Sequence, residues 1–170
     1  MKWFLVALLT VLASLHSAAG DLSPQENLLR QAMTPTGKEF ERALEPGAAI
    51  RAYIRSGHVR RKPDDAADYV DYRRLRKPAT LFGHPLLVLE EEYMTQYIGC
   101  CVNPGIGLVI EVQGSTAALD AFLAANKCRR NWPSGPEDSL DKAGVKPKPD
   151  ATYVSITCRQ NDMRDAETQQ

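Results

Sequence analysis

Three consecutive carboxylates, Glu90, Glu91 and Glu92, are the first group in this sequence whose type and spacing could do chemistry. Paired carboxylates serve as general acid and base in glycoside hydrolysis, or as oxygen ligands of a hard cation. On a strand, Glu90 and Glu92 would share one face, and His84 comes shortly before them. His84, Glu90 and Glu92 are therefore the candidate catalytic residues of a small hydrolase. We favour the alternative that the charges keep an exposed face or an edge strand soluble.

Four cysteines, Cys100, Cys101, Cys128 and Cys158, form the second group. An even number of cysteines in an exported chain favours disulfides. A bond between Cys100 and Cys101 is disfavoured, because neighbouring Cα atoms lie about 3.8 Å apart and disulfides usually span about 4.4–6.8 Å. We therefore expect Cys128 and Cys158 each to bond one of the adjacent pair, in either combination. Adjacent cysteines suit zinc poorly, and a C-x-x-C redox motif is absent, so we predict neither a metal nor a cofactor.

The segment 129–151 holds the third group, Trp132 with Arg129 and Arg130. It contains four prolines and two glycines and has no sustained hydrophobic period. Loops longer than about 12–15 residues in a compact domain are usually functional or disordered. Tryptophan and arginine often anchor protein interfaces, so these three residues are the candidate binding residues. The alternative is that Trp132 folds back onto the core.

Other catalytic signatures are absent from the sequence. It has no G-x-S-x-G nucleophile motif, no H-E-x-x-H motif and no phosphate-binding glycine loop. Gly105 and Gly107 follow Asn103-Pro104, and we interpret this stretch as a hairpin turn. The balance of these observations is against an enzyme.

Residues 1–20 are expected to be a cleavable secretory signal. Lys2 gives the positive start, an apolar run of about 11 residues follows, and residues 17–20 are all small. The run is shorter than the roughly 20 residues that a membrane-spanning helix needs. We therefore expect a mature protein that begins at Asp21, is periplasmic or secreted, and has no stable membrane insertion.

The charge composition limits the partners. The chain has 21 basic and 21 acidic residues, a formal net charge of +0. This balance gives no general electrostatic attraction to nucleic acid, so we expect no nucleic-acid partner.

The first third of the mature chain has helical signals. Residues 23–26 (SPQE) form a capping box that opens a short helix. Residues 36–39 (TGKE) repeat this signal and predict a second helix, which Pro46-Gly47 would interrupt. Helical spacing then continues from Ile50 to Gly57.

The remainder reads mainly as strands. Residues 69–74, 86–94, 97–102, 107–113 and 152–158 are predicted strands, and those in 86–113 should form an antiparallel meander. Alternation in the last strand should place Val154, Ile156 and Cys158 on one face. An alanine-rich helix over about 115–127 interrupts this series.

These elements indicate the α+β class. We expect N-terminal helices and one C-terminal helix, packed on a four- to five-stranded, mostly antiparallel sheet and stabilised by disulfides. One domain should span residues 21–158, with 129–151 as a long loop and 159–170 as a frayed polar tail.

Small size, a disulfide scaffold and the missing catalytic motifs favour a small exported protein-binding domain. Such a protein would be an inhibitor- or immunity-like accessory protein, and its partner would be another envelope or extracellular protein. The alternative function is a small exported hydrolase that uses His84 with Glu90 and Glu92.

Overall fold

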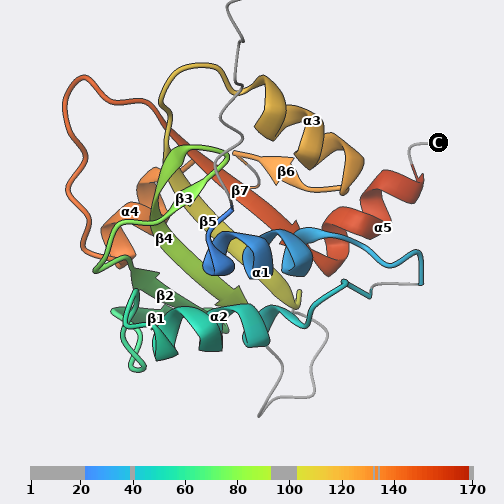
Figure 1. Ribbon diagram of the computed structural model, residues 1–170, viewed down its shortest axis with the longest axis horizontal. Coiled ribbons are helices and arrows are strands. Elements are labelled where there is room, and N and C mark those ends of the chain that lie inside the picture. The colour runs from blue at the N-terminus through green and yellow to red at the C-terminus, as the bar shows by residue number, and fades with distance from the viewer. Residues whose placement is uncertain (1–21, 39–40, 93–102, 132, 134, 169–170) are drawn as a thin grey trace, which may run out of the picture.

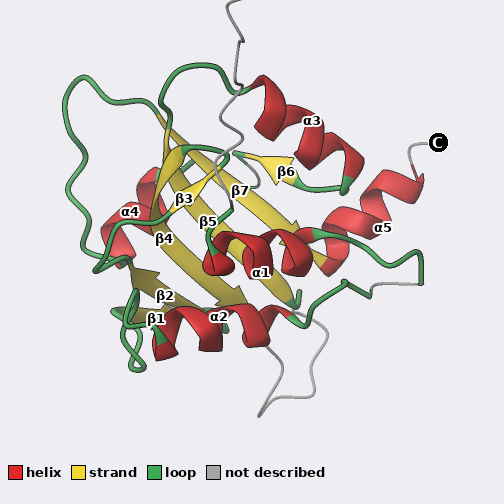
Figure 2. Ribbon diagram, in the orientation of Figure 1, coloured by secondary structure: helices red, strands yellow, loops and turns green. Residues whose placement is uncertain are grey.

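A computed structural model describes residues 22–38, 41–92, 103–131, 133 and 135–168. Within these residues the chain forms five helices and seven strands (Figures 1 and 2). The helices are α1 (Pro24–Met33), α2 (Pro46–Arg55), α3 (Ala117–Ala125), α4 (Glu137–Lys142) and α5 (Gln160–Thr168). The strands are β1 (Asp65–Ala67), β2 (Val70–Arg74), β3 (Thr80–Leu81), β4 (His84–Glu92), β5 (Gly105–Glu111), β6 (Arg129–Arg130) and β7 (Tyr153–Arg159).

The strands form one antiparallel sheet in the order β1-β2-β4-β5-β7-β6, with β3 paired to β4. The α+β class is confirmed. The described residues contain more strands than the four or five expected. The strands β1, β3 and β6 were missed because they have only two or three residues each. Hydrophobic alternation cannot be recognised over so short a stretch.

The two faces of the sheet are covered differently. Helices α1, α2 and α3 pack on one face, and their apolar side chains join those of β4, β5 and β7 in the main hydrophobic core. Figure 1 shows α1 and α2 in front of the sheet and α4 behind it. The smaller cluster on the α4 face consists of Val88, Val109, Leu140 and Ala143. Only part of that second face is apolar, and the remainder holds the site described below.

The N-terminal helices start at local capping signals. The Ser23 side chain accepts a hydrogen bond from the Glu26 backbone N–H, as the capping box predicted. The second helix was predicted wrongly. It starts at Pro46, where proline suits the first helical position, and Glu45 caps it. The described residues between 34 and 45 are not helical, and Glu39 and Phe40 lie outside the described part of the chain.

Most of the later elements agree with the sequence prediction. Strands β2, β4, β5 and β7 and helix α3 all occur close to their predicted positions. Val154, Ile156 and Cys158 share one face as expected, and that face meets the main core. The predicted strand over 97–102 and the secretory signal over 1–20 lie outside the described residues.

Two segments are more ordered than predicted. The expected loop over 129–151 contains β6 and α4. Leu140 of α4 is buried, and so is Ala143, which follows the helix. The expected tail contains the end of β7 and helix α5, where Asp162 and Met163 are buried. The helices α4 and α5 are short, and their stability comes from tertiary packing rather than from a strong local signal.

The cysteine pairing was also predicted wrongly. A disulfide joins Cys128 to Cys158, with their Cα atoms 4.5 Å apart. Antiparallel pairing of β6 with β7 aligns Arg129 with Thr157, which brings the preceding Cys128 to Cys158. Cys100 and Cys101 lie outside the described residues. No helix in the described ranges is both long enough and apolar enough to cross a membrane.

Candidate functional site

The three glutamates lie on a central strand rather than on an edge strand. Strand β4 pairs with β2 on one side and with β5 on the other. Glu90 and Glu92 share the α4 face, as alternation predicted, and are only 6% and 7% exposed. The expectation of a solvated, charged face is therefore wrong. Two buried carboxylates need partners inside the protein, because an uncompensated charge in the interior is costly.

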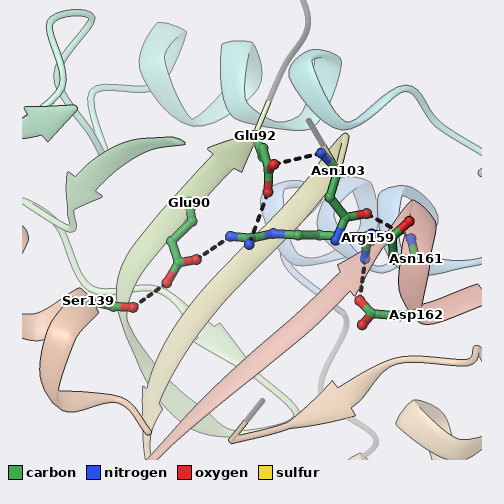
Figure 3. Close-up of polar contacts among 7 residues, drawn as sticks. All are labelled: Glu90, Glu92, Asn103, Ser139, Arg159, Asn161 and Asp162. Atoms are coloured by element: carbon green, nitrogen blue, oxygen red, sulfur yellow. Dashed lines mark hydrogen bonds and ion pairs between the residues drawn. The ribbon is translucent and has the colours of Figure 1, made fainter. Parts of the chain in front are cut away.

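One guanidinium group bridges the two carboxylates (Figure 3). Arg159 Nη2 lies 2.6 Å from Glu90 Oε2, and its Nη1 lies 3.1 Å from Glu92 Oε2. The Ser139 hydroxyl donates to Glu90 Oε1 at 2.5 Å, and the Asn103 backbone N–H donates to Glu92 Oε1 at 2.6 Å. Each of the four carboxylate oxygens therefore has one hydrogen-bonded or charged partner.

The position of Arg159 is fixed by the junction between β7 and α5. The Asp162 carboxylate accepts a hydrogen bond from the Arg159 backbone N–H at 2.6 Å. The Asn103 side chain accepts one from the Asn161 backbone N–H at 2.7 Å (Figure 3). These two bonds satisfy backbone donors at the start of α5, which a helix leaves without internal partners. The same residues that begin α5 therefore hold the arginine in place.

Two glycines of β5 give the arginine side chain room to reach β4. In the sheet register, Gly107 lies between Glu90 and Thr157, and Gly105 lies between Glu92 and Arg159. A Cβ atom on Gly107 would lie 2.3 Å from Glu90 Oε2 and 3.1 Å from Arg159 Nη2. Gly107 lies in β5 as the predicted strand over 107–113 requires, but the hairpin-turn interpretation is wrong for Gly105, which also belongs to β5. Their missing side chains let Arg159 contact the glutamates across β5.

A pocket of about 230 Å³ opens beside this cluster. Its lining comes mainly from β2, β4, β7 and α4: Asp68, Val70, Tyr72, Glu90, Glu92, Pro133, Gly135, Asp138, Ser139, Ser155, Thr157 and Arg159. Thr157 is 7% exposed, and its hydroxyl has no hydrogen-bond partner among the described residues. A buried polar group without a partner is uncommon in native proteins and calls for an explanation.

The pocket lining is negatively charged. Four carboxylates and one guanidinium line it, which leaves a net charge of −3 when all are ionised. Burial raises the pKa of Glu92, while the Asn103 backbone N–H and Arg159 oppose that rise. Burial, with the nearby Glu90 carboxylate, raises the pKa of Tyr72 to about 12. Tyr72 therefore keeps its proton at neutral pH.

His84 does not join this site. A β-bulge between Leu86 and Val88 shifts the alternation of β4, so that Leu86 faces the main core and Val88 faces α4. His84 is two residues before Leu86, on the core side, and is 1% exposed. Its Nδ1 accepts a hydrogen bond from the Gln113 backbone N–H at 3.1 Å. The expected convergence of His84 with Glu90 and Glu92 is therefore wrong.

Arg129 and Arg130, two of the three candidate binding residues, form β6, which pairs with β7 at the edge of the sheet. Arg129 Nε lies 4.0 Å from the Asp162 carboxylate, and Arg130 pairs with Asp120 of α3. Both arginines therefore take part in contacts within the chain. Trp132 lies outside the described residues, but its neighbour in sequence, Pro133, lines the pocket.

Sequence reasoning did not identify Arg159, Thr157 or the two glycines as site residues. A signal for them exists in three matched patterns of period two: Glu90-x-Glu92, Gly105-x-Gly107 and Thr157-x-Arg159. The patterns become informative only when the strands are placed side by side in register, which is a long-range property.

The arrangement is suited to binding a polar group in a partly buried pocket. In the described part of the chain, no three His, Cys, Asp or Glu side chains gather as metal ligands would. Comparisons with protein-family models, with curated proteins and with solved structures found no match to this chain.

Proposed function

We propose that this chain is an exported binding protein, an inhibitor- or immunity-like accessory protein of another envelope or extracellular protein. The observation that supports this most is the hydroxyl of Thr157, which is buried in a polar pocket and has no partner in the described structure. Such a group is satisfied when a ligand supplies the missing hydrogen bond. The pocket would then receive a polar side chain of the partner protein.

The hydrogen bonding of the glutamates favours binding over catalysis. Each carboxylate oxygen of Glu90 and Glu92 already has a partner in Arg159, Ser139 or the Asn103 backbone. A general acid or base must instead be free to exchange a proton with the substrate. The fixed network is typical of a preorganised recognition surface, whose side chains lose little conformational entropy when a partner binds.

One observation still favours the alternative function of an exported hydrolase. Two carboxylates reach one pocket, and burial raises the pKa of Glu92, as is common for general acids. In this alternative Glu90 and Glu92 would act without His84, which lies on the other face of the sheet.

The Cys128–Cys158 disulfide supports an exported location, because such bonds persist mainly in oxidising compartments. Trp132 stays a predicted binding residue, and its neighbour in sequence, Pro133, lines the pocket. Arg129 and Arg130 would contribute indirectly, through their ion pairs with Asp162 and Asp120.

A charge reversal at the pocket entrance tests the proposal. Asp138 lines the pocket and its side chain is 58% exposed, so Asp138→Lys should preserve the fold while losing the ion pair of Asp138 with Lys142. Asp141→Lys is the matched control, because Asp141 is exposed on the same helix and does not line the pocket. Residues 21–170, carrying either change or Trp132→Ala, are used as bait against the envelope and extracellular fractions of the producing organism.

We expect a stoichiometric partner that the native protein and Asp141→Lys retain. Asp138→Lys and Trp132→Ala should each weaken its binding by at least about tenfold, the effect of losing an interface anchor. Equal binding by all four proteins would place the partner elsewhere and contradict the pocket. Carboxylate-dependent cleavage of an oligosaccharide, with no partner recovered, would favour the hydrolase.

A further inference from the structure

The glutamate–arginine cluster is not electrically balanced by itself. One guanidinium faces two carboxylates, so the buried group of Glu90, Glu92 and Arg159 has a net charge of −1 when all three are ionised. Asp68 and Asp138 add two further negative charges to the lining, and Lys142, 3.8 Å from Asp138, offsets one of them. A group that balances this negative charge must be a cation, because the carboxylates would repel an anionic ligand.

The Thr157 hydroxyl supplies an open hydrogen-bond acceptor beside these carboxylates. Thr157 aligns with Gly107, which in turn aligns with Glu90, so its hydroxyl lies on the same part of the sheet as the carboxylates. That hydroxyl has no partner within the described residues and can accept a bond from an N–H donor. Each glutamate oxygen also keeps a second lone pair beyond the partner already described.

We propose that the pocket binds an alkyl cation that carries N–H donors, the side chain of a lysine or an arginine on the partner protein. Its charge would complete the balance of Glu90, Glu92 and Arg159, and one N–H would donate to Thr157. This inference rests on the proposed function and specifies the chemistry that the same site recognises.

Burial of Glu92 adds independent support. Its raised pKa has burial as its largest cause, so the Glu92 carboxylate is poorly compensated in the folded chain. A cation in the pocket would favour the ionised form. The pocket volume of about 230 Å³ is below the roughly 300–1,000 Å³ of typical small-molecule pockets, so the site suits a small group.

The test uses small probes and one isosteric substitution. Residues 21–170 are titrated with Nα-acetyl-lysinamide and Nα-acetyl-argininamide while backbone amide chemical shifts are recorded by NMR. Nα-acetyl-norleucinamide is the neutral control, and Nα-acetyl-glutamate is the anionic control. Thr157→Val removes the hydroxyl, and Thr152→Val makes the same change at an exposed position of the chain outside the pocket.

We expect saturable shifts at Tyr72, Ser139 and Thr157 with at least one cationic probe, with a dissociation constant on the order of 1 mM. The tighter cationic probe identifies lysine or arginine as the source. Thr157→Val should weaken its binding about tenfold, the effect of one hydrogen bond to a charged group, and Thr152→Val less than about twofold.

Two results would overturn the inference. One is equal or tighter binding of either control probe, and the other is the absence of saturable shifts with both cations. If the partner captured above still depends on Asp138, either result rejects the ligand chemistry but leaves the proposed function standing. If no partner is captured while a cationic probe binds, the proposed function fails and the cation site remains.

Discussion

At the scale of single residues, the site depends on charges that the fold buries and then partly neutralises. Replacing one member of a buried ion pair usually costs about 3–5 kcal/mol, because the other charge is left without compensation. Glu90 and Glu92 share one guanidinium, so neither carboxylate has a full counter-charge of its own. Burial is the largest cause of the raised pKa of Glu92, and the nearby Glu90 carboxylate adds to it.

Glu92 should therefore make the stability of the protein depend on pH. Because its pKa is raised in the folded state, the folded chain holds this proton more tightly than the unfolded chain does. The linkage relation then makes the free energy of unfolding fall as pH rises through that region. The cost of the ionised Glu92 is thus present at neutral pH and is relieved as pH falls through its folded pKa.

We expect Glu92→Gln to remove this contribution. We compare the free energy of unfolding of the variant with that of the native protein, by urea unfolding at pH 5 and at pH 7. The difference, variant minus native, should be more positive at pH 7. The groups that face Glu92 are Glu90, Arg159 and Asp162, and all three remain in the variant. Glu137→Gln, a change at an exposed residue of α4, is the control. Its free energy of unfolding should differ from that of the native protein by the same amount at both pH values. A pH-independent effect of Glu92→Gln would contradict this account.

At the scale of elements, β5 shapes the site because two of its residues have no side chain. Its neighbours β4 and β7 carry the acidic and basic side chains, and Gly105 and Gly107 keep the space between them open. Glycine inside a strand usually weakens it, because it brings no side chain to pack. Here the missing side chains leave room for the ion pairs that form across the strand.

Gly107→Ala tests this role of β5. The added methyl would lie 2.3 Å from Glu90 Oε2, so the carboxylate or the strand must move. We expect the free energy of unfolding to fall by about 1–3 kcal/mol, as for other overpacked interiors. In a Glu90→Ala background the same change should cost much less, because the obstructing carboxylate is gone. Equal costs in both backgrounds, measured by denaturant unfolding, would show that the clash with Glu90 is not the cause.

At the scale of the whole molecule, the disulfide links the end of α3 to the last strand. Cys128 lies three residues after the end of α3, and Cys158 lies within β7, next to the site residues Thr157 and Arg159. The bond joins residues 30 positions apart, so it restricts the unfolded chain considerably. It also holds β6 against β7 at the edge of the sheet.

Replacing both Cys128 and Cys158 by serine should lower the free energy of unfolding by about 3–4 kcal/mol, from the entropy of a loop of this length. The measurement is guanidinium unfolding of residues 21–170 under non-reducing conditions, compared with the native protein. Peptide mapping without reductant should recover the Cys128 and Cys158 peptides joined to one another. Their recovery joined instead to a peptide containing Cys100 and Cys101 would contradict the observed pairing.

The sequence by itself determined the local elements of this protein. A capping serine, period-two alternation and an alanine-rich stretch depend on interactions between residues close in the chain. For that reason α1, α3, β2, β5 and β7 were predicted near their observed positions. The shared face of Glu90 and Glu92 follows from the same local geometry.

Only the tertiary structure decided which residues meet. The bulge in β4 put His84 on the opposite face from Glu90 and Glu92, although their spacing suggested one cluster. Register across β4, β5 and β7 brought Arg159 and Thr157 to the glutamates, and pairing of β6 with β7 brought Cys128 to Cys158. These contacts join residues tens of positions apart, and a shift of register by one residue would reverse every face. Their stability comes from the packing of the complete sheet, which no local stretch of sequence contains.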